Sequence, residues 1–519
     1  MKRYLIFILF IGFVLLITNA QSHMQNYIRT FTPRVTVADA TTISPEYVPA
    51  VTNYFDGLGR PIQTIYEGIT PQSTDLVTMI EYDSIGRVSK EWLPVPISDG
   101  LTAAYRDPSY VKSQSVSFYD GDAYAYTQIA YDSSPLKRIL KKTGPGASWH
   151  VNDKSVRLDY LTNTTTGILS VPYYTVEGGK LKKSGNYPIG TLYVNVTKDE
   201  DGITVYEFTD TEGKRIRYKN VDYVYDNLGH LRYVLPPRLQ LKADGFYEVT
   251  PGSDLYNLAF VYTYDKRGNC LTKKLPGIAP IYYVYDRADR LILVQTPNQR
   301  PHAEWSFTKY DIYSRPVLSG TVILQNKNHS QLQDEYCNIL VREYFVGVSQ
   351  ANCWGYSNET LPTTNLTVLK ADYYDDYGFK ALTSFGSILD YQVRSGFLST
   401  HYPILTGAHT GSAVKTFDNS ITTLLYTAYY YDIKGHLIQQ RGNNLIGGYD
   451  HFYTSYDFSG EPLEILHEHS SSQISLLTER YSYEYDHRGR LINATHSLND
   501  RSTVYIGHYS YDNLGRLIS

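Results

Sequence analysis

The chain has 519 residues, of which 52 are tyrosine, and its 48 basic and 52 acidic residues give a formal net charge of -4. This balance provides no basic surface for nucleic acid, and the combination of 42% hydrophobic and 19% charged residues excludes a largely disordered chain. Tyrosine favours strands, where a half-buried ring keeps its hydroxyl hydrogen-bonded. The composition therefore predicts an all-β protein and argues against helical bundles, coiled coils and multipass membrane proteins.

The first twenty residues have the pattern of a signal peptide. Lys2 and Arg3 precede an apolar run from Tyr4 to Ile17, and small residues follow up to Ala20. We expect residues 1–20 to direct export, so that the protein is secreted, held at the cell surface or placed in the periplasm. An uncleaved anchor is the alternative. No later stretch reaches about 18 apolar residues, so membrane contact is expected only through this export signal.

Residues 21–220 read as an all-β lead-in domain. Prolines separate short segments that are typical of strands, such as Thr191 to Val196. The acidic stretch from Lys198 to Gly202 lacks the length and the distal glutamate of a calcium-binding loop, so it predicts a turn. Gly144 to Gly146 is likewise expected to be a turn and not a phosphate-binding loop.

Tyr-Asp pairs recur along the whole chain, more often than chance mixing of these residues would produce. They begin at Tyr82, Tyr119, Tyr131, Tyr225, Tyr264, Tyr285, Tyr310, Tyr374, Tyr431, Tyr449, Tyr456, Tyr485 and Tyr511. A glycine follows three residues after Asp83, Asp226, Asp265, Asp375, Asp432, Asp457, Asp486 and Asp512, and also after Asp56 and Asp210. Asp289 and Ser314 replace this glycine in two further units, while Asp120, Asp132 and Asp450 lack it and are candidates for coincidence.

Each unit predicts a β-hairpin. Aromatic residues alternate before the aspartate, as in Tyr481, Tyr483 and Tyr485, which places their rings on one face of a strand. The aspartate begins the turn by accepting a backbone N–H two residues on, and the glycine supplies the positive φ of a type I turn with a G1 bulge. The returning strand then adds residues such as Leu231 or Leu491 to the tyrosine face.

The tyrosine stripe has two interpretations, a buried core or an exposed platform for glycans. A stripe repeated in so many units favours the core, and burial of Tyr262, Tyr264, Tyr483 and Tyr485 would support that interpretation. The Arg or His after the glycine is expected to be a solvated strand residue that pairs with a nearby aspartate for at most about 1 kcal/mol.

Units of this length cannot bury an aromatic face alone, so they are expected to stack side by side as in a solenoid. The segment from Gln325 to Thr363 is the clearest insertion between units, and it contains Cys337 and Cys353. These two cysteines could form a disulfide after export, with Cys270 left over; unbonded thiols are the alternative.

The sequence Tyr-Asp-x-x-Gly-Arg-Leu, at Tyr485 to Leu491 and Tyr511 to Leu517, resembles the YD repeat of bacterial Rhs and wall-associated proteins, a repeat also similar to that of animal teneurins. The resemblance covers residues 221–519. Upstream segments at 54–61, 207–214 and 223–237 resemble the uncharacterised N-terminal region of secreted Rhs-like proteins. The resemblance implies a spiralling β-sheet that forms a shell or open barrel, enclosing a C-terminal toxin in complete members.

This chain departs from complete Rhs proteins at its C-terminal end. It lacks the segment rich in Asp-Pro and glycine that closes the shell, and it stops partway along the return strand of its last hairpin. We expect the C-terminal core and toxin to be absent, because the gene product is either truncated or continued by a separately encoded polypeptide.

No pattern of catalysis is present: the chain contains no HExxH, GxSxG, GxxxxGK[ST] or GxGxxG sequence. Asp375 and Asp376 are adjacent, so on a strand they point to opposite faces. His467 and His469 are the closest pair of histidines, and we expect no metal site there. The prediction includes no catalytic residue, no cofactor and no metal.

The sequence thus predicts a non-enzymatic, exported β-repeat scaffold. Its expected partner is an encapsulated polypeptide encoded downstream, with no binding of nucleic acid. The first alternative is an adhesin that binds surface glycans, and a polysaccharide hydrolase is less favoured.

Overall fold

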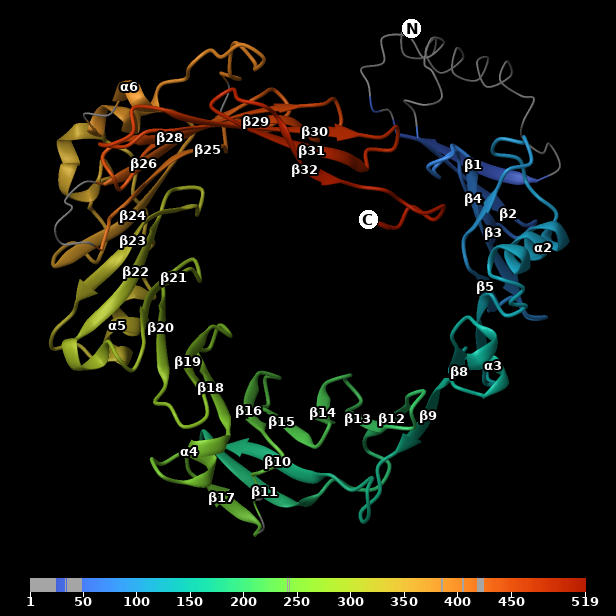
Figure 1. Cartoon of the computed structure of the whole chain (residues 1–519). Coiled ribbons are helices and arrows are strands. Elements are labelled where there is room, and N and C mark those ends of the chain that lie inside the picture. The colour runs from blue at the N-terminus through green and yellow to red at the C-terminus, as the bar shows by residue number, and fades with distance from the viewer. Residues whose placement is uncertain are drawn as a thin grey trace, which may run out of the picture.

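The computed structural model describes residues 25–32, 34, 49–239, 241, 243–383, 386–403, 406–417 and 424–519. The predicted signal peptide lies outside the described residues. The described chain forms a 29-stranded antiparallel sheet and a separate three-stranded sheet, so the predicted all-β class is confirmed. The large sheet curls into a ring that brings its last strands next to its first ones (Figure 1).

The first part of the large sheet extends from β1 to β14 and continues directly into the second part. Arg217 pairs with Asp222, so strands on either side of residue 220 belong to one ladder. The strands of the first part are β1 (Asn26–Phe31), β2 (Ala50–Phe55), β3 (Pro61–Tyr66), β4 (Asp75–Tyr82), β5 (Val88–Trp92), β6 (Val95–Ile97), β7 (Tyr126–Tyr131), β8 (Ile139–Thr143), β9 (Val156–Thr162), β12 (Tyr193–Lys198), β13 (Thr204–Thr209) and β14 (Arg215–Tyr218).

The second part is a meander in which each strand pairs with the next strand of the large sheet. Its strands are β15 (Val221–Tyr225), β16 (Leu231–Leu235), β18 (Phe260–Tyr264), β19 (Cys270–Lys274), β20 (Ile281–Tyr285), β21 (Leu291–Gln295), β22 (Glu304–Tyr310), β23 (Pro316–Ile323), β24 (Leu366–Tyr374), β25 (His409–Val414), β26 (Leu425–Tyr431), β27 (Leu437–Asn443), β28 (Tyr449–Tyr456), β29 (Pro462–His469), β30 (Leu477–Tyr485), β31 (Leu491–Leu498) and β32 (Val504–His508).

Short helices and the small sheet lie on the outside of the ring (Figure 1). The small sheet consists of β10 (Pro172–Glu177), β11 (Lys180–Asn186) and β17 (Gly245–Tyr247). The helices are α2 (Pro108–Phe118), α3 (Ala147–Val151), α4 (Asp254–Leu258), α5 (His329–Tyr336) and α6 (Gly386–Leu389), with 3-10 turns η2 (Arg300–His302), η3 (Gly347–Cys353) and η4 (Gly378–Leu382). Among the described residues, no helix has the length and hydropathy needed to cross a bilayer.

The Asp-x-x-Gly hairpin has the predicted geometry. At Asp226, the carboxylate Oδ1 accepts the backbone N–H groups of Leu228 and His230 at 3.0 and 2.9 Å, and Gly229 has a φ of +83°. The ladder shifts register before Tyr225, which pairs with Leu231 on the same face. The turn is also closed by two backbone bonds, from the N–H of Asp226 to the carbonyl of His230 and from the N–H of Gly229 to the carbonyl of Asp226. The same two backbone bonds form at Asp56, Asp83, Asp199, Asp210, Asp265, Asp432, Asp457, Asp486 and Asp512, and at Asp286 and Asp311 with Asp289 and Ser314 in the glycine position.

Two units differ from the predicted pattern. Asp375 has a glycine at the expected spacing, but Gly378 begins η4, and the chain returns to the sheet only at His409. The apparent turn is therefore the start of an insertion, because the aspartate is held by Arg315 and by the N–H of Gly407. Asp132 lacks the glycine but still begins a hairpin turn, which is longer. Its backbone N–H donates to the carbonyl of Arg138.

In nine units, the tyrosine before the aspartate connects its hairpin to the preceding one. The hydroxyl of Tyr264 donates to the carbonyl of Leu231 at 3.0 Å, at the start of the preceding return strand. A phenylalanine cannot make this bond, which explains why the repeat uses tyrosine. Equivalent bonds are made by Tyr82, Tyr225, Tyr310, Tyr374, Tyr431, Tyr456, Tyr485 and Tyr511.

The basic residue after the glycine also connects neighbouring hairpins. The predicted pairing with a nearby aspartate is confirmed, but the prediction that the residue is solvated was wrong for most units. Arg490 donates to Asp486 of its own turn at 2.6 Å, and its guanidinium lies 5.1 Å from the centre of the next Tyr-Asp ring, that of Tyr511. Its side chain is only 16% exposed. Arg60, Arg87, Arg290 and Arg315 make the same pair of contacts. In two other units the contact with the next tyrosine is made by a histidine: His230 stacks on Tyr264, and His436 packs at a tilt against Tyr456.

The fully buried core lies on the face opposite the tyrosine stripe. Val261 and Tyr233 are buried against Leu181 of the small outer sheet, whereas Tyr262 and Tyr264 alternate with Val261 and are half-buried. The outer elements cover one face of the sheet, which leaves the stripe on the inner face. The prediction that the stripe forms the buried core was therefore wrong, because outer elements bury the alternate residues.

The ends of the sheet meet with an offset. The turn after β30 contacts residues 67–68, which connect β3 and β4 at the rim opposite the turns at Asp56 and Asp83. Arg488 donates to the carbonyls of Glu67 and Gly68, and His487 contacts the Gly68 carbonyl at 3.0 Å. Strand alternation places the Asp486 turn on the same rim as the Asp56 turn. The rim that carries the Asp486 turn therefore meets the opposite rim of the first strands. Over one full circuit the sheet is displaced by about one strand length, so the ring is a spiral.

Candidate functional site

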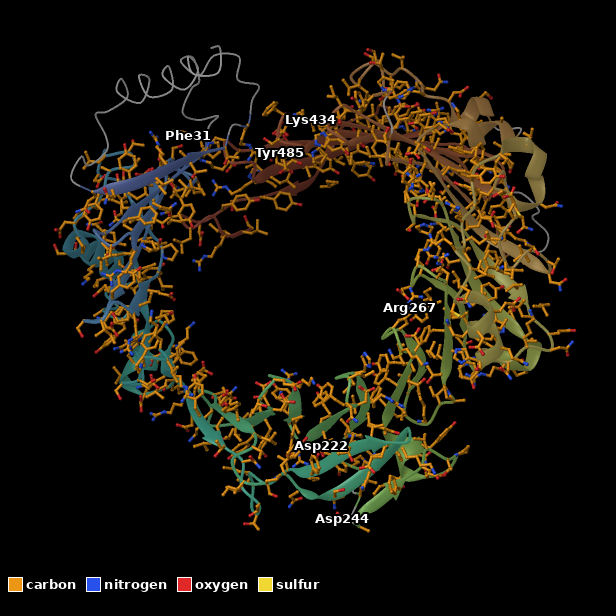
Figure 2. All side chains as sticks on the ribbon, turned by 180° about the vertical axis from the view of Figure 1, so that it is seen from behind. Phe31, Asp222, Asp244, Arg267, Lys434 and Tyr485 are labelled. Carbon is orange, nitrogen blue, oxygen red and sulfur yellow. The ribbon has the colours of Figure 1, made fainter. Side chains whose placement is uncertain are left out.

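The inner face of the ring is one candidate surface. Tyr485, labelled in Figure 2, belongs to a strand whose alternate residues Tyr481 and Tyr483 share its face. All three rings are half-buried. With all described side chains drawn, the centre of the ring stays open (Figure 2). This wall presents ring faces, while the Tyr-Asp hydroxyls are occupied by backbone carbonyls of the shell itself.

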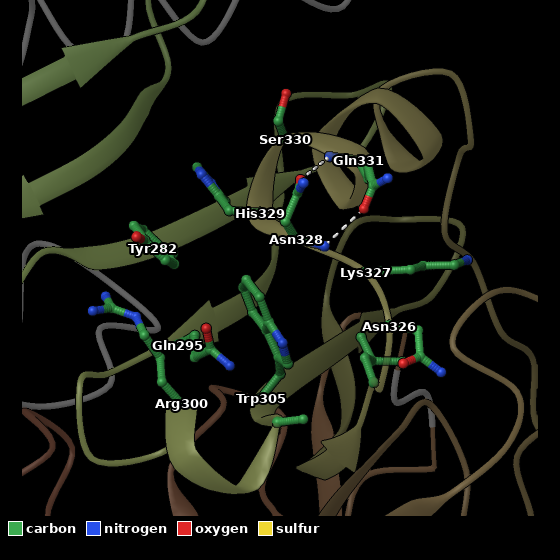
Figure 3. A pocket seen from close by; sticks show the side chains of 12 residues that line it. Tyr282, Gln295, Arg300, Trp305, Asn326, Lys327, Asn328, His329, Ser330 and Gln331 are labelled. Atoms are coloured by element: carbon green, nitrogen blue, oxygen red, sulfur yellow. Dashed lines mark hydrogen bonds between the residues drawn. The ribbon is translucent and has the colours of Figure 1, made fainter.

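The pocket beside α5 is a second candidate site and has a volume of about 740 Å³ (Figure 3). Tyr282 lies at its wall, between the guanidinium of Arg300 at 4.0 Å and the imidazole of His329 at 4.6 Å. The imidazole and phenol rings are nearly parallel, at 8°. Trp305 forms part of the lining and is 2% exposed. The pocket is thus lined by a stack of a guanidinium, a phenol and an imidazole.

The polar groups of this pocket are arranged for an anionic ligand. Arg300 has buried Nε and terminal nitrogen atoms with no hydrogen-bond partner, although guanidinium groups usually donate all their protons. His329 contacts the carbonyl of Tyr283 through Nε2 at 2.8 Å, and burial lowers its pKa, so the ring is neutral near pH 7. The unpaired positive charge in the pocket therefore belongs to Arg300.

A histidine–aspartate cluster lies between β28 and β29. The carboxylate Oδ1 of Asp450 is 3.0 Å from Nε2 of His467 and 2.7 Å from Nδ1 of His469. Burial opposes ionisation of Asp450, but hydrogen bonds from the two histidines outweigh it and lower the pKa of this carboxyl. The three ligand atoms lie within 4.8 Å of one another, which is the arrangement of a potential metal site.

The other residues considered from the sequence for a site or a disulfide lie in different environments. Asp375 is bound by both terminal nitrogens of Arg315, and Asp376 caps the N–H of Gly378, so the two carboxylates do not act as a pair. The three cysteines are free, and the disulfide alternative for Cys337 and Cys353 is not realised. The stretch from Lys198 to Gly202 is a turn, as predicted, closed by the Asp199 carboxylate.

Comparison with known proteins gives one family match and distant structural similarities. The model of a domain of unknown function, DUF6443, matches residues 29–162. No curated protein matches the chain. The crystal structure titled TcdB2-TccC3-TEV is 14% identical with a TM-score of 0.43, over 97% of this chain and 23% of that one. A structure of the Photorhabdus luminescens Tc holotoxin pore is 15% identical with a TM-score of 0.40, over 95% and 22%. This chain spans less than a quarter of either length.

Proposed function

We propose that this chain is an exported, non-enzymatic scaffold of the Rhs or YD-repeat type, which surrounds a polypeptide with one turn of β-shell. The observation that carries the proposal is the offset ring, whose open centre is lined by a repeated tyrosine stripe. The Asp-x-x-Gly hairpins and the motif resemblance supply the assignment to this type. Residues 1–20 would supply the export signal.

The inner face of the ring, with its tyrosine stripe, can contact a polypeptide of unspecified sequence. Phenol rings contact apolar side chains over a large area, and the hydroxyls of Tyr-Asp tyrosines such as Tyr264 and Tyr485 are already bonded to backbone carbonyls of the sheet, so these hydroxyls offer little specific hydrogen bonding to a ligand. The many contacts between hairpins hold the wall in place before anything binds. Such a surface contains a cargo without selecting it by a few strong contacts.

The contact between the turn after β30 and residues 67–68, here called the seam, provides the test. We expect the chain, isolated with a tag from its native host, to carry a companion polypeptide that resists protease. Arg488→Glu removes two charge-assisted bonds to carbonyls, each worth about 1.5–3 kcal/mol, so the opened population should rise about 100-fold or more. Digestion of the companion, followed by mass spectrometry, should accelerate by a similar factor.

Arg267→Glu is the matched control because Arg267 occupies the same turn position after Asp265 as Arg488 does after Asp486, but bonds to Asp289 away from the seam. It should leave digestion unchanged. Absence of any companion, or equal digestion in the wild type and both variants, would contradict the enclosing function.

The pocket beside α5 favours one second function, binding of an acidic glycan. The edges of the stacked Tyr282 and His329 rings can contact a sugar ring, and the guanidinium of Arg300, two of whose nitrogens have no hydrogen-bond partner, can bind its carboxylate. We expect an oligosaccharide containing glucuronic acid to bind more tightly than its neutral glucose counterpart. Arg300→Met should weaken the acidic probe about 10–100-fold in titration calorimetry, the loss expected for charge-assisted bonds.

Arg138→Met is the control for this experiment, since Arg138 lies 5.1 Å over the ring of Tyr160 outside the pocket. Equal affinity for acidic and neutral sugars, or no response to Arg300→Met, would rule out this function without bearing on the enclosing function.

A further inference from the structure

The cluster of Asp450, His467 and His469 is built by strand register. Asp450 lies directly opposite His469 in the β28–β29 ladder, and Phe452 lies opposite His467. Side chains two residues apart on a strand share a face, so both histidines point to the same side as the aspartate. The ring of Phe452 stacks on His467 at 4.3 Å and 3°, which fixes the orientation of the imidazole.

A second carboxylate, that of Glu479, contacts the ring nitrogen of His467 that Asp450 does not contact. Glu479 on β30 is opposite His467, and its Oε2 is 2.9 Å from Nδ1 of His467. Carboxylates on the outer nitrogen of a ligating histidine are typical of zinc sites, where they fix the tautomer and raise the basicity of the ligand. His496 on β31 lies 3.9 Å from the other oxygen of Glu479, and its buried Nε2 has no hydrogen-bond partner.

The number of hydrogen-bond donors on His467 explains why a cation fits between this residue and Asp450. Both ring nitrogens of His467 face carboxylate oxygens, but a neutral imidazole has only one N–H to donate. With a neutral ring, therefore, only one of these two contacts can be an N–H···O hydrogen bond. A metal ion at Nε2 resolves this conflict, because Nδ1 keeps its proton for Glu479.

We propose that Asp450, His467 and His469 bind a divalent transition-metal ion, and that zinc is the natural occupant. Two imidazoles and one carboxylate are zinc ligands, and three protein ligands leave the fourth tetrahedral position to water or to a donor from another molecule. Zinc–nitrogen and zinc–oxygen bonds of about 2.0–2.2 Å require the three ligand atoms to separate slightly from their present contacts.

The site faces the centre of the ring. The other face of β29 carries Glu468, which bonds to Tyr453 and to Arg394 of the segment that follows α6. Phe397 of that segment also packs on Tyr453, and α6 lies outside the ring (Figure 1). The open coordination position is therefore on the inner wall. The proposal does not depend on the enclosing function, since it rests on side-chain geometry alone.

The test is zinc binding by the full chain, prepared without a histidine tag and treated with a chelator. We expect one equivalent of zinc to bind at pH 7.5 in titration calorimetry. His469→Ala should abolish this binding, and Glu479→Gln should weaken it about 10–100-fold, as second-carboxylate substitutions do. Cobalt used as a spectroscopic probe should give the visible absorption of a tetrahedral site in the wild type and lose it in His469→Ala.

His508→Ala is the matched control, because His508 is an exposed histidine on β32, away from the cluster, where it contacts Asn493. It should bind zinc as the wild type does. Circular dichroism identifies variants that do not fold, and His467→Gln then provides an independent removal of a ligand. No stoichiometric zinc binding by the wild type, or undiminished binding by both folded ligand variants, would overturn the proposal.

Discussion

Replacing Lys309 with methionine is expected to lower the free energy of unfolding by about 3–5 kcal/mol, because the substitution leaves a buried carboxylate without its counter-ion. Lys309 and Glu343 are both 0% exposed, and their charged atoms are 2.8 Å apart. The ammonium also donates to Asn358 and to the carbonyl of Thr360, which satisfies all three of its protons. Denaturant unfolding followed by fluorescence measures the loss.

Lys327→Met is the control for this variant, since Lys327 forms an exposed pair with Glu335 and its removal should cost at most about 1 kcal/mol. Equal losses in the two variants would show that the buried pair does not stabilise the insertion between β23 and β24.

The same pair predicts how stability depends on pH. Burial opposes ionisation of Glu343, but the charge of Lys309 and the hydroxyls of Ser357 and Thr360 outweigh it, so the pKa of Glu343 lies below its usual value. A carboxyl with a lowered pKa stabilises the fold above its unfolded pKa, and this contribution is lost as the pH falls through the folded pKa. Wild-type stability should fall in this acidic range, and Lys309→Met should flatten that part of the profile.

Replacing Asp286 with alanine is the second large effect, with an expected loss of about 3–5 kcal/mol. This turn aspartate has a fully buried side chain, and its Oδ2 accepts from Arg290 at 2.5 Å. Its Oδ1 accepts the backbone N–H groups of Ala288 and Arg290. Alanine would leave these backbone donors without partners and the guanidinium of Arg290, which keeps its bonds to Val341 and Ser314, without its counter-ion. Thermal and denaturant unfolding provide the measurement.

Asp512→Ala provides the matched comparison within the same turn motif. Asp512 accepts the same two backbone bonds and pairs with Arg516, but the aspartate is 26% and the arginine 73% exposed. Water can replace the lost partners there, so the cost should be about 1 kcal/mol. If the two substitutions cost the same, burial does not set the contribution of the turn aspartate.

Local chemistry made the hairpins predictable. An aspartate that accepts two N–H groups and a glycine with positive φ need only a few consecutive residues, so Asp226 and Gly229 could be recognised without knowledge of the fold. The exception is instructive: Asp375 and Gly378 have the right spacing, yet Arg315 from another hairpin binds the aspartate and the chain leaves the sheet. A contact between distant residues overrode the local preference.

The sites were less predictable because their partners come from separate strands. His467 and His469 were visible in the sequence as a pair, but the carboxylates that give them a chemical environment are Asp450 and Glu479, on the strands to either side. The signal available was the period-two spacing of both histidines. Register between strands, which the sequence does not state, was needed to bring the carboxylates to them.

The sequence by itself determined the class of the fold, the position of most turns and the alternation of the strands, since these depend on backbone preferences within a few residues. Only the tertiary structure decided which face of the sheet is the core. Outer elements bury Val261 and leave Tyr262 half-buried on the inner face, although alternation alone treats the two faces alike. The offset closure between Arg488 and Gly68 was likewise a tertiary outcome, because the accumulated curvature of the whole sheet brings its ends together.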